Sequence, residues 1–115
     1  MAGSGASSIM AKSLKPMRGD ISVLKPRHSA FYGTPLDILL EGMGAREIIL
    51  AGIATDMCVH LTAADAFLRS YKVRVPANWT ASETVEAKHR SLEHMDSVLR
   101  CDVRPMEAGA MLRLC

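Results

Sequence analysis

The stretch from Glu47 to Phe67 reads EIILAGIATDMCVHLTAADAF and decides the fold. Its opening run, EIILAG, is continuously apolar and of strand length, which is typical of a strand buried on both faces of a parallel sheet. After a short polar turn, a helix is predicted from about Met57 to Arg69. The apolar stripe of that helix consists of Val59, Ala63, Ala66 and Phe67. The sequence therefore predicts a strand, a tight turn and a helix, with Cys58 in the first turn of the helix.

The segment before this unit predicts a further strand and helix. Residues 21–24 read as a short strand that Pro26 closes. Thr34 stands where an N-cap is expected, and Pro35 stands at the first helical position. Apolar residues follow at helical spacing until a pair of glycines ends the element. We therefore expect a helix that begins at Pro35.

The segment after Phe67 repeats the alternation. YKVRVPA, residues 71–77, is typical of a short strand. Thr80 and Glu83 have the spacing of a capping box, which predicts a long helix through Arg100. The residues of that helix expected to face inward are Val85, Leu92, Met95 and Leu99. CDVRP, residues 101–105, is a candidate for a last short strand, and a frayed or docked tail follows.

Strands and helices thus alternate along the chain with short connections. Such alternation favours parallel strands joined by right-handed helical crossovers. The expected fold is α/β, with three α/β/α layers around an open, mostly parallel sheet of Rossmann-like type. Residues 1–12 read as a flexible leader and residues 13–115 as one domain. In such sheets ligands bind at the carboxyl ends of the strands, where Lys25 and the Cys58 turn both stand.

Composition and charge narrow the classes of function. The 115 residues carry a formal net charge of +2 and scattered basic residues, so we expect no nucleic-acid partner. The apolar runs are far shorter than a bilayer span, so we expect no membrane partner. Three widely spaced cysteines without a C-x-x-C pair favour a reducing compartment. We therefore predict a cytoplasmic protein.

Two residues near the expected strand ends are candidates for chemistry. A helix start, exposed backbone amides and a cation such as Lys25 would stabilise a thiolate at Cys58, and the amides would stabilise an oxyanion. A free cysteine can equally be a core packing residue, and a lysine at a strand end can be an ordinary surface residue. His28 has a side chain suited to general acid or base catalysis. Cys101 and Cys115 have no such setting and are expected to be inert.

Cofactor signals are absent from the sequence. The four histidines lack metal-ligand spacing with a partner carboxylate, so we expect no metal. Gly52 resembles the first glycine of a nucleotide-binding loop, but no G-x-G-x-x-G or Walker pattern follows it. We therefore expect no cofactor.

Three segments of the chain read KPRHSAFYGTPLDILL, EIILAGIATDMCVHLTAADAF and YKVRVPANWTAS. Together they resemble the isochorismatase-like cysteine hydrolase superfamily, which includes nicotinamidases and N-carbamoyl and ureidoacrylate amidohydrolases. The shared features are a lysine before SAF, a G-I-A-T-x-x-C-V turn and T-A-x-D-A, in that order. The resemblance runs from about Ile9 to Val103, and it implies the isochorismatase-like fold.

The resemblance also implies a catalytic mechanism. Cys58 would be the nucleophile and Lys25 the cationic member of an Asp-Lys-Cys triad. A non-proline cis peptide between Ile53 and Ala54 would turn backbone amides, with that of Cys58, toward the oxyanion. The thiolate would attack a small amide or carbamoyl substrate, form a thioester and release ammonia or an amine. The substrate pocket would be lined by Phe31, Tyr32 and His28.

The sequence departs from the family pattern at its start. The family opens with a strand ending in an aspartate, the base of the triad, and no segment here matches it. We therefore expect an N-terminally truncated form that lacks the first strands of the sheet. Activity would be reduced, since general-base assistance is typically worth about 10²–10⁴-fold. The alternative is a non-catalytic isoform or remnant that associates with full-length subunits, and the expected assembly is a homo-oligomer or a complex with a full-length homologue.

Two smaller departures lie in the second half of the chain. Asn78 stands where relatives often have aspartate. Ser70 replaces a common helix-ending glycine, at a cost of about 1 kcal/mol if the backbone there is left-handed.

Overall fold

The structure, a computed structural model, describes residues 17–107. The predicted leader, the C-terminal tail and Cys115 lie outside these residues. The helices are α2 (Leu36–Gly42), α3 (His60–Leu68) and α4 (Val85–Ser97), and the strands are β1 (Glu47–Ile49), β2 (Gly52–Ile53), β3 (Lys72–Arg74) and β4 (Thr80–Ala81). A π-helical turn, Thr55–Val59, leads directly into α3, and a 3₁₀ turn, Ala77–Trp79, precedes β4.

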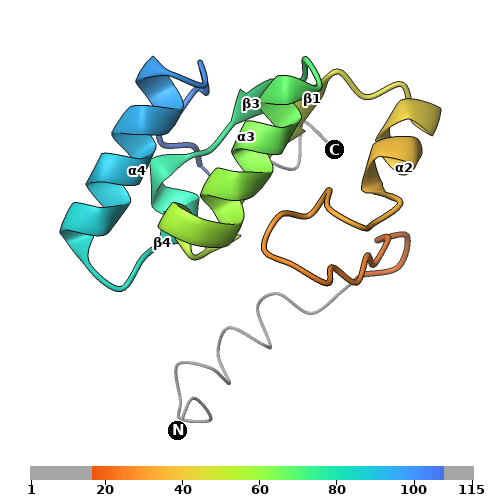
Figure 1. The fold of residues 1–115 in the computed structure, drawn as a ribbon, viewed down its shortest axis with the longest axis horizontal. Coiled ribbons are helices and arrows are strands. Elements are labelled where there is room, and N and C mark those ends of the chain that lie inside the picture. The colour runs from red at the N-terminus through yellow and green to blue at the C-terminus, as the bar shows by residue number, and fades with distance from the viewer. Residues whose placement is uncertain (1–16, 108–115) are drawn as a thin grey trace, which may run out of the picture.

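The strands pair in parallel, as the alternation predicts. β1 pairs with β3 in the register Glu47 to Lys72, and β2 pairs with β4 in the register Gly52 to Thr80. The ladder is interrupted between these pairs because Pro76 has no N–H to donate and the 3₁₀ turn follows it. The predicted α/β class with an open parallel sheet is confirmed, although the sheet consists of two short pieces. α3 and α4 lie side by side, and α2 lies apart from both, beyond β1 (Figure 1).

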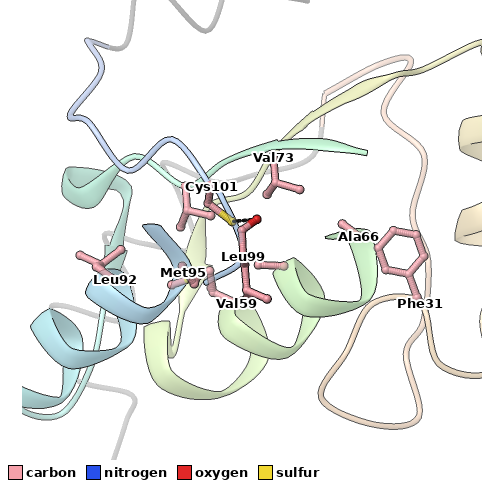
Figure 2. Close-up of a cluster of buried hydrophobic side chains, with 10 residues drawn as sticks. Phe31, Val59, Ala66, Val73, Leu92, Met95, Leu99 and Cys101 are labelled. Atoms are coloured by element: carbon pink, nitrogen blue, oxygen red, sulfur yellow. Dashed lines mark hydrogen bonds between the residues drawn. The ribbon is translucent and has the colours of Figure 1, made fainter. Parts of the chain in front are cut away.

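The core lies where α3, α4 and β3 meet. Figure 2 shows the side chains that form it: Val59 from the π-helical turn, Ala66 from α3, Val73 from β3, and Leu92 and Met95 from α4. Ala63, Ala66 and Met95 are fully buried. The alanines let the two helices approach closely, and Met95 fills the irregular space between them. Cys101 closes the cluster, with its Sγ 3.9 Å from the carbonyl oxygen of Leu99.

The strand predicted at residues 21–24 is wrong. The segment is irregular, and Leu24 is 93% exposed. No neighbouring strand among residues 17–107 pairs with it, so its backbone has no ladder to join. The candidate strand at 101–105 forms only a single parallel bridge, between Asp102 and Arg74.

The predicted burial of EIILAG on both faces is also wrong. β1 is half-buried throughout, and both residues of β2 are exposed. Each of the two sheets has only two strands, so β1 and β2 each have one strand neighbour among the described residues. Likewise, Phe67 is 41% exposed although it belongs to the predicted inner stripe of its helix.

Two helix starts differ from the prediction. Pro35 is the N-cap of α2 and the helix begins at Leu36, whose N–H donates to the Thr34 hydroxyl at 3.3 Å. α4 begins at Val85 with Thr84 as its cap, because the Thr84 hydroxyl accepts from Ala87 N–H at 3.1 Å. The capping box at Thr80 and Glu83 is therefore wrong, and the predicted inward-facing Val85 is 64% exposed.

The end of α3 has the backbone geometry expected at Ser70. Ser70 has φ of +67°, in the left-handed region. Its N–H donates to the Phe67 carbonyl at 3.0 Å, and Tyr71 N–H donates to the Ala66 carbonyl at 3.1 Å. These two bonds form a Schellman motif, whose left-handed residue is usually glycine.

Candidate functional site

The turn that carries Cys58 is built from special backbone geometry. Gly52 has φ of +122°, a conformation that L side chains rarely adopt. The Ile53–Ala54 peptide bond is cis. The Ala54 carbonyl then accepts from the N–H groups of Met57 and Val59, at 3.1 and 3.2 Å. These contacts close the π-helical turn and place Cys58 one residue before its end.

Buried hydroxyl groups hold this turn against the rest of the domain. Thr55 is fully buried, and its hydroxyl lies 2.7 Å from the hydroxyl of Thr80 in β4. Ser91 in α4 donates to the Thr55 carbonyl oxygen at 3.0 Å. On the exposed side, Ser82 donates to Asp56 at 2.9 Å. The turn is therefore attached both to β4 and to α4.

Lys25 reaches Cys58 although the two residues are 33 positions apart. Lys25 Nζ lies 3.5 Å from Cys58 Sγ and also donates to the His28 carbonyl oxygen at 3.2 Å. Cys58 is half-buried. The contact brings an ammonium group next to a thiol at a helix start, the arrangement that stabilises a thiolate.

The loop that presents Lys25 is attached to α3 by two residues of the TAADA segment. Thr62 accepts from Ala30 N–H at 3.0 Å, and Asp65 accepts from the Ser29 hydroxyl at 2.5 Å. The T-A-x-D-A pattern contains both residues, but no role was predicted for them from the sequence. Their spacing of three on a helix is the signal that they face the same side.

No carboxylate among residues 17–107 forms an ion pair with Lys25. Each ion pair in this part of the chain uses Arg69, Lys72, Arg74 or Arg104. Among the described residues, Lys25 therefore contacts the Cys58 thiol and has no carboxylate within ion-pair distance.

A cavity of about 560 Å³ opens beside the Lys25 loop and α3. Its lining includes His28 and Tyr32 from the loop, and Leu61, Ala64 and Asp65 from α3. Leu61 lies one helical turn after Cys58, on the same side of the helix. Cys58 and Lys25 themselves do not line the cavity.

Phe31, the third residue predicted for the substrate pocket, lies elsewhere. It is 4% exposed and belongs to the core. The Arg69 guanidinium lies 4.7 Å from its ring centroid, and the Tyr71 ring lies 6.1 Å away. The structure therefore brings His28 and Tyr32 together at the cavity and places Phe31 behind the loop as packing.

Cys101 differs from Cys58 in its surroundings. It is 2% exposed, and burial together with the nearby Asp96 carboxylate raises its pKa to about 11. Such a thiol stays protonated near neutral pH and is a poor nucleophile. Within residues 17–107, no three histidine, cysteine or acidic side chains are grouped so that they could hold a metal ion. No helix in the same range is both long and apolar enough to cross a bilayer.

Comparison with known proteins identifies the family. The isochorismatase domain model matches residues 6–103. The uncharacterized isochorismatase family protein YaaI of Bacillus subtilis is 38% identical over 94 residues, which cover 82% of this chain and 52% of that protein. The ureidoacrylate amidohydrolase RutB of Methylobacterium radiotolerans is 42% identical over 82 residues, 71% of this chain and 32% of that protein. The chain thus spans about half of the first relative and a third of the second.

Solved structures agree with this result. The nicotinamidase PncA of Bacillus subtilis superposes with a TM-score of 0.76 at 31% identity, covering 88% of this chain and 56% of that one. The N-carbamoylsarcosine amidase of Thermoplasma acidophilum superposes with a TM-score of 0.72 at 32% identity, covering 78% and 50%. The family match over most of the chain, together with this shared fold, shows that the chain belongs to the isochorismatase family.

Proposed function

We propose that this chain carries the nucleophile half of a cysteine hydrolase site for a small amide or carbamoyl substrate. The observation that carries the proposal is the 3.5 Å contact between Lys25 Nζ and Cys58 Sγ. This contact joins two segments that are far apart in the sequence, at the edge of the domain where β2 ends. An ammonium group this close to a cysteine sulfur favours the thiolate, which is the nucleophilic form of the side chain.

The chemistry follows from the groups at hand. The Cys58 thiolate attacks the carbonyl carbon of the substrate, and a C–S bond forms as the carbonyl oxygen becomes an oxyanion. The backbone N–H groups of Ile53, Ala54 and Cys58 are the candidates to stabilise that oxyanion. The tetrahedral species then breaks its C–N bond, and Lys25 supplies a proton to the leaving nitrogen. Water cleaves the resulting thioester and regenerates the thiol.

The cavity beside the Lys25 loop, which Cys58 and Lys25 adjoin in sequence without lining it, has a size that supports a small substrate. A cavity of about 560 Å³ is within the range of small-molecule sites. His28, Tyr32 and Arg27 contribute polar groups to its lining, and Leu61 and Ala64 contribute apolar surface. Three of the relatives are named for nicotinamide, N-carbamoylsarcosine and ureidoacrylate, which are all small amides or carbamoyl compounds, so we extend this class to the present chain.

A second candidate function is association without catalysis. The described residues offer no carboxylate to Lys25, and the apolar side chains of Ile53 and Met57 on the turn itself are 59% and 46% exposed. Exposed apolar side chains beside a site are typical of a surface that another chain covers. In this reading the chain pairs with a second copy or with a full-length homologue, and its Cys58 forms no thioester. A cytoplasmic location stays a prediction for either function.

The experiment is to detect the thioester directly. The purified chain is mixed with nicotinamide, N-carbamoylsarcosine or ureidoacrylate, quenched in acid and analysed by intact and peptide mass spectrometry. The proposal predicts an acyl adduct on the peptide that contains Cys58, together with ammonia or amine release. Cys58→Ala abolishes both, whereas Cys101→Ala, the matched control, leaves both in place. An intact Cys58 thiol with every substrate, in a chain that is folded and binds a second chain, supports association instead.

A further inference from the structure

A series of hydrogen-bonded groups connects α4 to the turn that carries Cys58. His94 Nδ1 lies 3.0 Å from His60 Nε2, at the start of α3. His60 Nδ1 lies 2.6 Å from Ser91 Oγ, back on α4. Ser91 Oγ lies 3.0 Å from the carbonyl oxygen of Thr55, three residues before Cys58. None of these four residues belongs to the site predicted from the sequence.

The direction of each hydrogen bond in this series follows from its buried end, the Thr55 carbonyl oxygen. A carbonyl oxygen only accepts, so the single Ser91 proton points to Thr55. Ser91 must then accept from His60, which places a proton on His60 Nδ1. His60 Nε2 is left with a lone pair, and it accepts from His94 Nδ1–H. The geometry therefore assigns the Nδ1–H tautomer to both imidazoles.

We propose that His94 and His60 are positioning residues, which commit the Ser91 hydroxyl to Thr55 and so hold the Cys58 turn against α4. Without the His94 donor, His60 could carry its proton on Nε2 and offer a bare Nδ1 to Ser91. The Ser91 proton would then turn toward His60 and leave the Thr55 oxygen. That same oxygen also accepts from the backbone N–H of His60, at the end of the π-helical turn. Its importance for catalysis rests on the function proposed above for Cys58.

Burial makes the hydrogen bond between Ser91 and Thr55 important for the position of the turn. Ser91 is 5% exposed and Thr55 is fully buried, so water offers neither an easy replacement partner. The His60 and His94 rings lie in contact, with centroids 4.9 Å apart, and are tilted by 35°. The outer member, His94, is exposed and can exchange protons with solvent. The arrangement couples a solvent-accessible imidazole to a buried oxygen three residues before the nucleophile.

The tautomer assignment applies to neutral His60. The charged and titratable groups that face His60 are Asp56 from the π-helical turn and Arg90 and His94 from α4. Burial first and His94 second lower the pKa of His60, and Asp56 opposes them. When a proton reaches Nε2, His60 keeps its Nδ1–H donation to Ser91, and His94 accepts at Nδ1 only if it carries its own proton on Nε2. Acidification is therefore expected to change the His60–His94 contact and to leave the Ser91–Thr55 hydrogen bond in place.

The decisive experiment reads the tautomers by long-range ¹H–¹⁵N NMR of the ¹⁵N-labelled chain near pH 7.5. The proposal expects His60 with its proton on Nδ1 and an unprotonated Nε2. His94→Leu is expected to shift His60 away from this state. His94→Asn, whose amide can place an N–H donor near the Nδ1 position, restores it. His89→Leu, on the same helix, is the matched control and leaves His60 unchanged. A His60 proton on Nε2 in the wild type, or no response to His94→Leu, overturns the proposal.

Amide hydrogen exchange on the same samples tests whether the turn is held. His94→Leu and Ser91→Ala are expected to speed exchange of the backbone N–H of His60 by about five- to tenfold, the effect of one lost hydrogen bond. The exchange rate of His94→Asn is expected to be close to that of the wild type. Unchanged exchange in folded variants overturns the positioning role. Neither readout depends on catalysis. An unreactive Cys58 in the wild type would refute the proposed function, whereas tautomer and exchange would still decide this proposal.

Discussion

Replacing Ser70 by glycine tests the local energetics of the fold. Ser70 has φ of +67° at the end of α3, in a Schellman motif closed by hydrogen bonds of 3.0 and 3.1 Å. An L residue in this region costs about 1–2 kcal/mol, because its Cβ approaches the neighbouring carbonyl oxygen. Glycine avoids this cost but loses more backbone entropy on folding, by about 0.5–1 kcal/mol. We therefore expect Ser70→Gly to stabilise the chain by about 1 kcal/mol.

The assay is urea denaturation followed by circular dichroism, with a thermal melt as a second measurement. The urea midpoint should rise with an unchanged slope, and Tm should rise by about 4 °C. Ser70→Ala is the matched control, because it removes the same hydroxyl while keeping the Cβ in the left-handed conformation. The reasoning would be refuted if Ser70→Gly were neutral or destabilising, or if Ser70→Ala stabilised the chain equally.

Three further predictions concern the cap, the core and the pH response. Thr84→Ala removes the N-cap of α4 and should cost about 1 kcal/mol in urea denaturation, whereas Glu83→Ala, at the discarded capping-box position, should cost almost nothing. Met95→Ala empties a fully buried site and should lower the free energy of unfolding by about 2–5 kcal/mol, with equal stability contradicting the described core. Because the pKa of His60 lies below its ordinary value of 6.5, the unfolded chain binds this proton more readily. Neutral His60 therefore makes its full contribution to the free energy of unfolding above pH 6.5, and this contribution is lost as the pH falls through the pKa of His60 in the folded state. His60→Asn should remove this part of the pH dependence of the unfolding free energy, and an unchanged pH dependence would refute the role given to His60.

Much of the central unit could be predicted from the sequence because local rules agree there. The apolar run, the glycine and the helical stripe all indicate a strand, a turn and a helix, and the structure contains them in that order. The proximity of Lys25 and Cys58 was expected, but from a strand before Lys25 that the structure lacks; an irregular segment brings Lys25 Nζ within 3.5 Å of Cys58 Sγ instead. The Ser70 geometry followed from glycine chemistry at helix ends.

The errors arose where tertiary contacts override a local pattern. Thr80 fits a capping box, yet it lies in β4 and its hydroxyl bonds to Thr55, so Thr84 caps the helix instead. Residues 21–24 have strand composition, but a strand needs a neighbour to pair with. The sequence pattern also does not show how Phe31 packs: its ring lies against Arg69 and Tyr71 in the core, and the pocket role that the resemblance implies stays a prediction.

The polar network around His60 could not be predicted from spacing alone. It joins residues of α3 and α4 that are more than 30 positions apart. No short motif encodes such a contact, because helix packing decides which faces meet. The contacts of Thr62 and Asp65 with the Lys25 loop could have been predicted, since the spacing of these two residues places them on one helix face beside Cys58.

The most direct test of the proposed Lys25–Cys58 pair is the alkylation rate of each cysteine by iodoacetamide near pH 7.5, read by peptide mass spectrometry on the native chain. We expect Cys58 to be labelled far faster than Cys101, whose pKa of about 11 keeps it protonated. Lys25→Met should slow Cys58 by about five- to tenfold, since it removes a cation 3.5 Å from the sulfur. Lys72→Met, an exposed lysine paired with Glu47, is the matched control and should change nothing. Labelling of Cys58 no faster than Cys101, or a Cys58 rate indifferent to Lys25, would contradict the account.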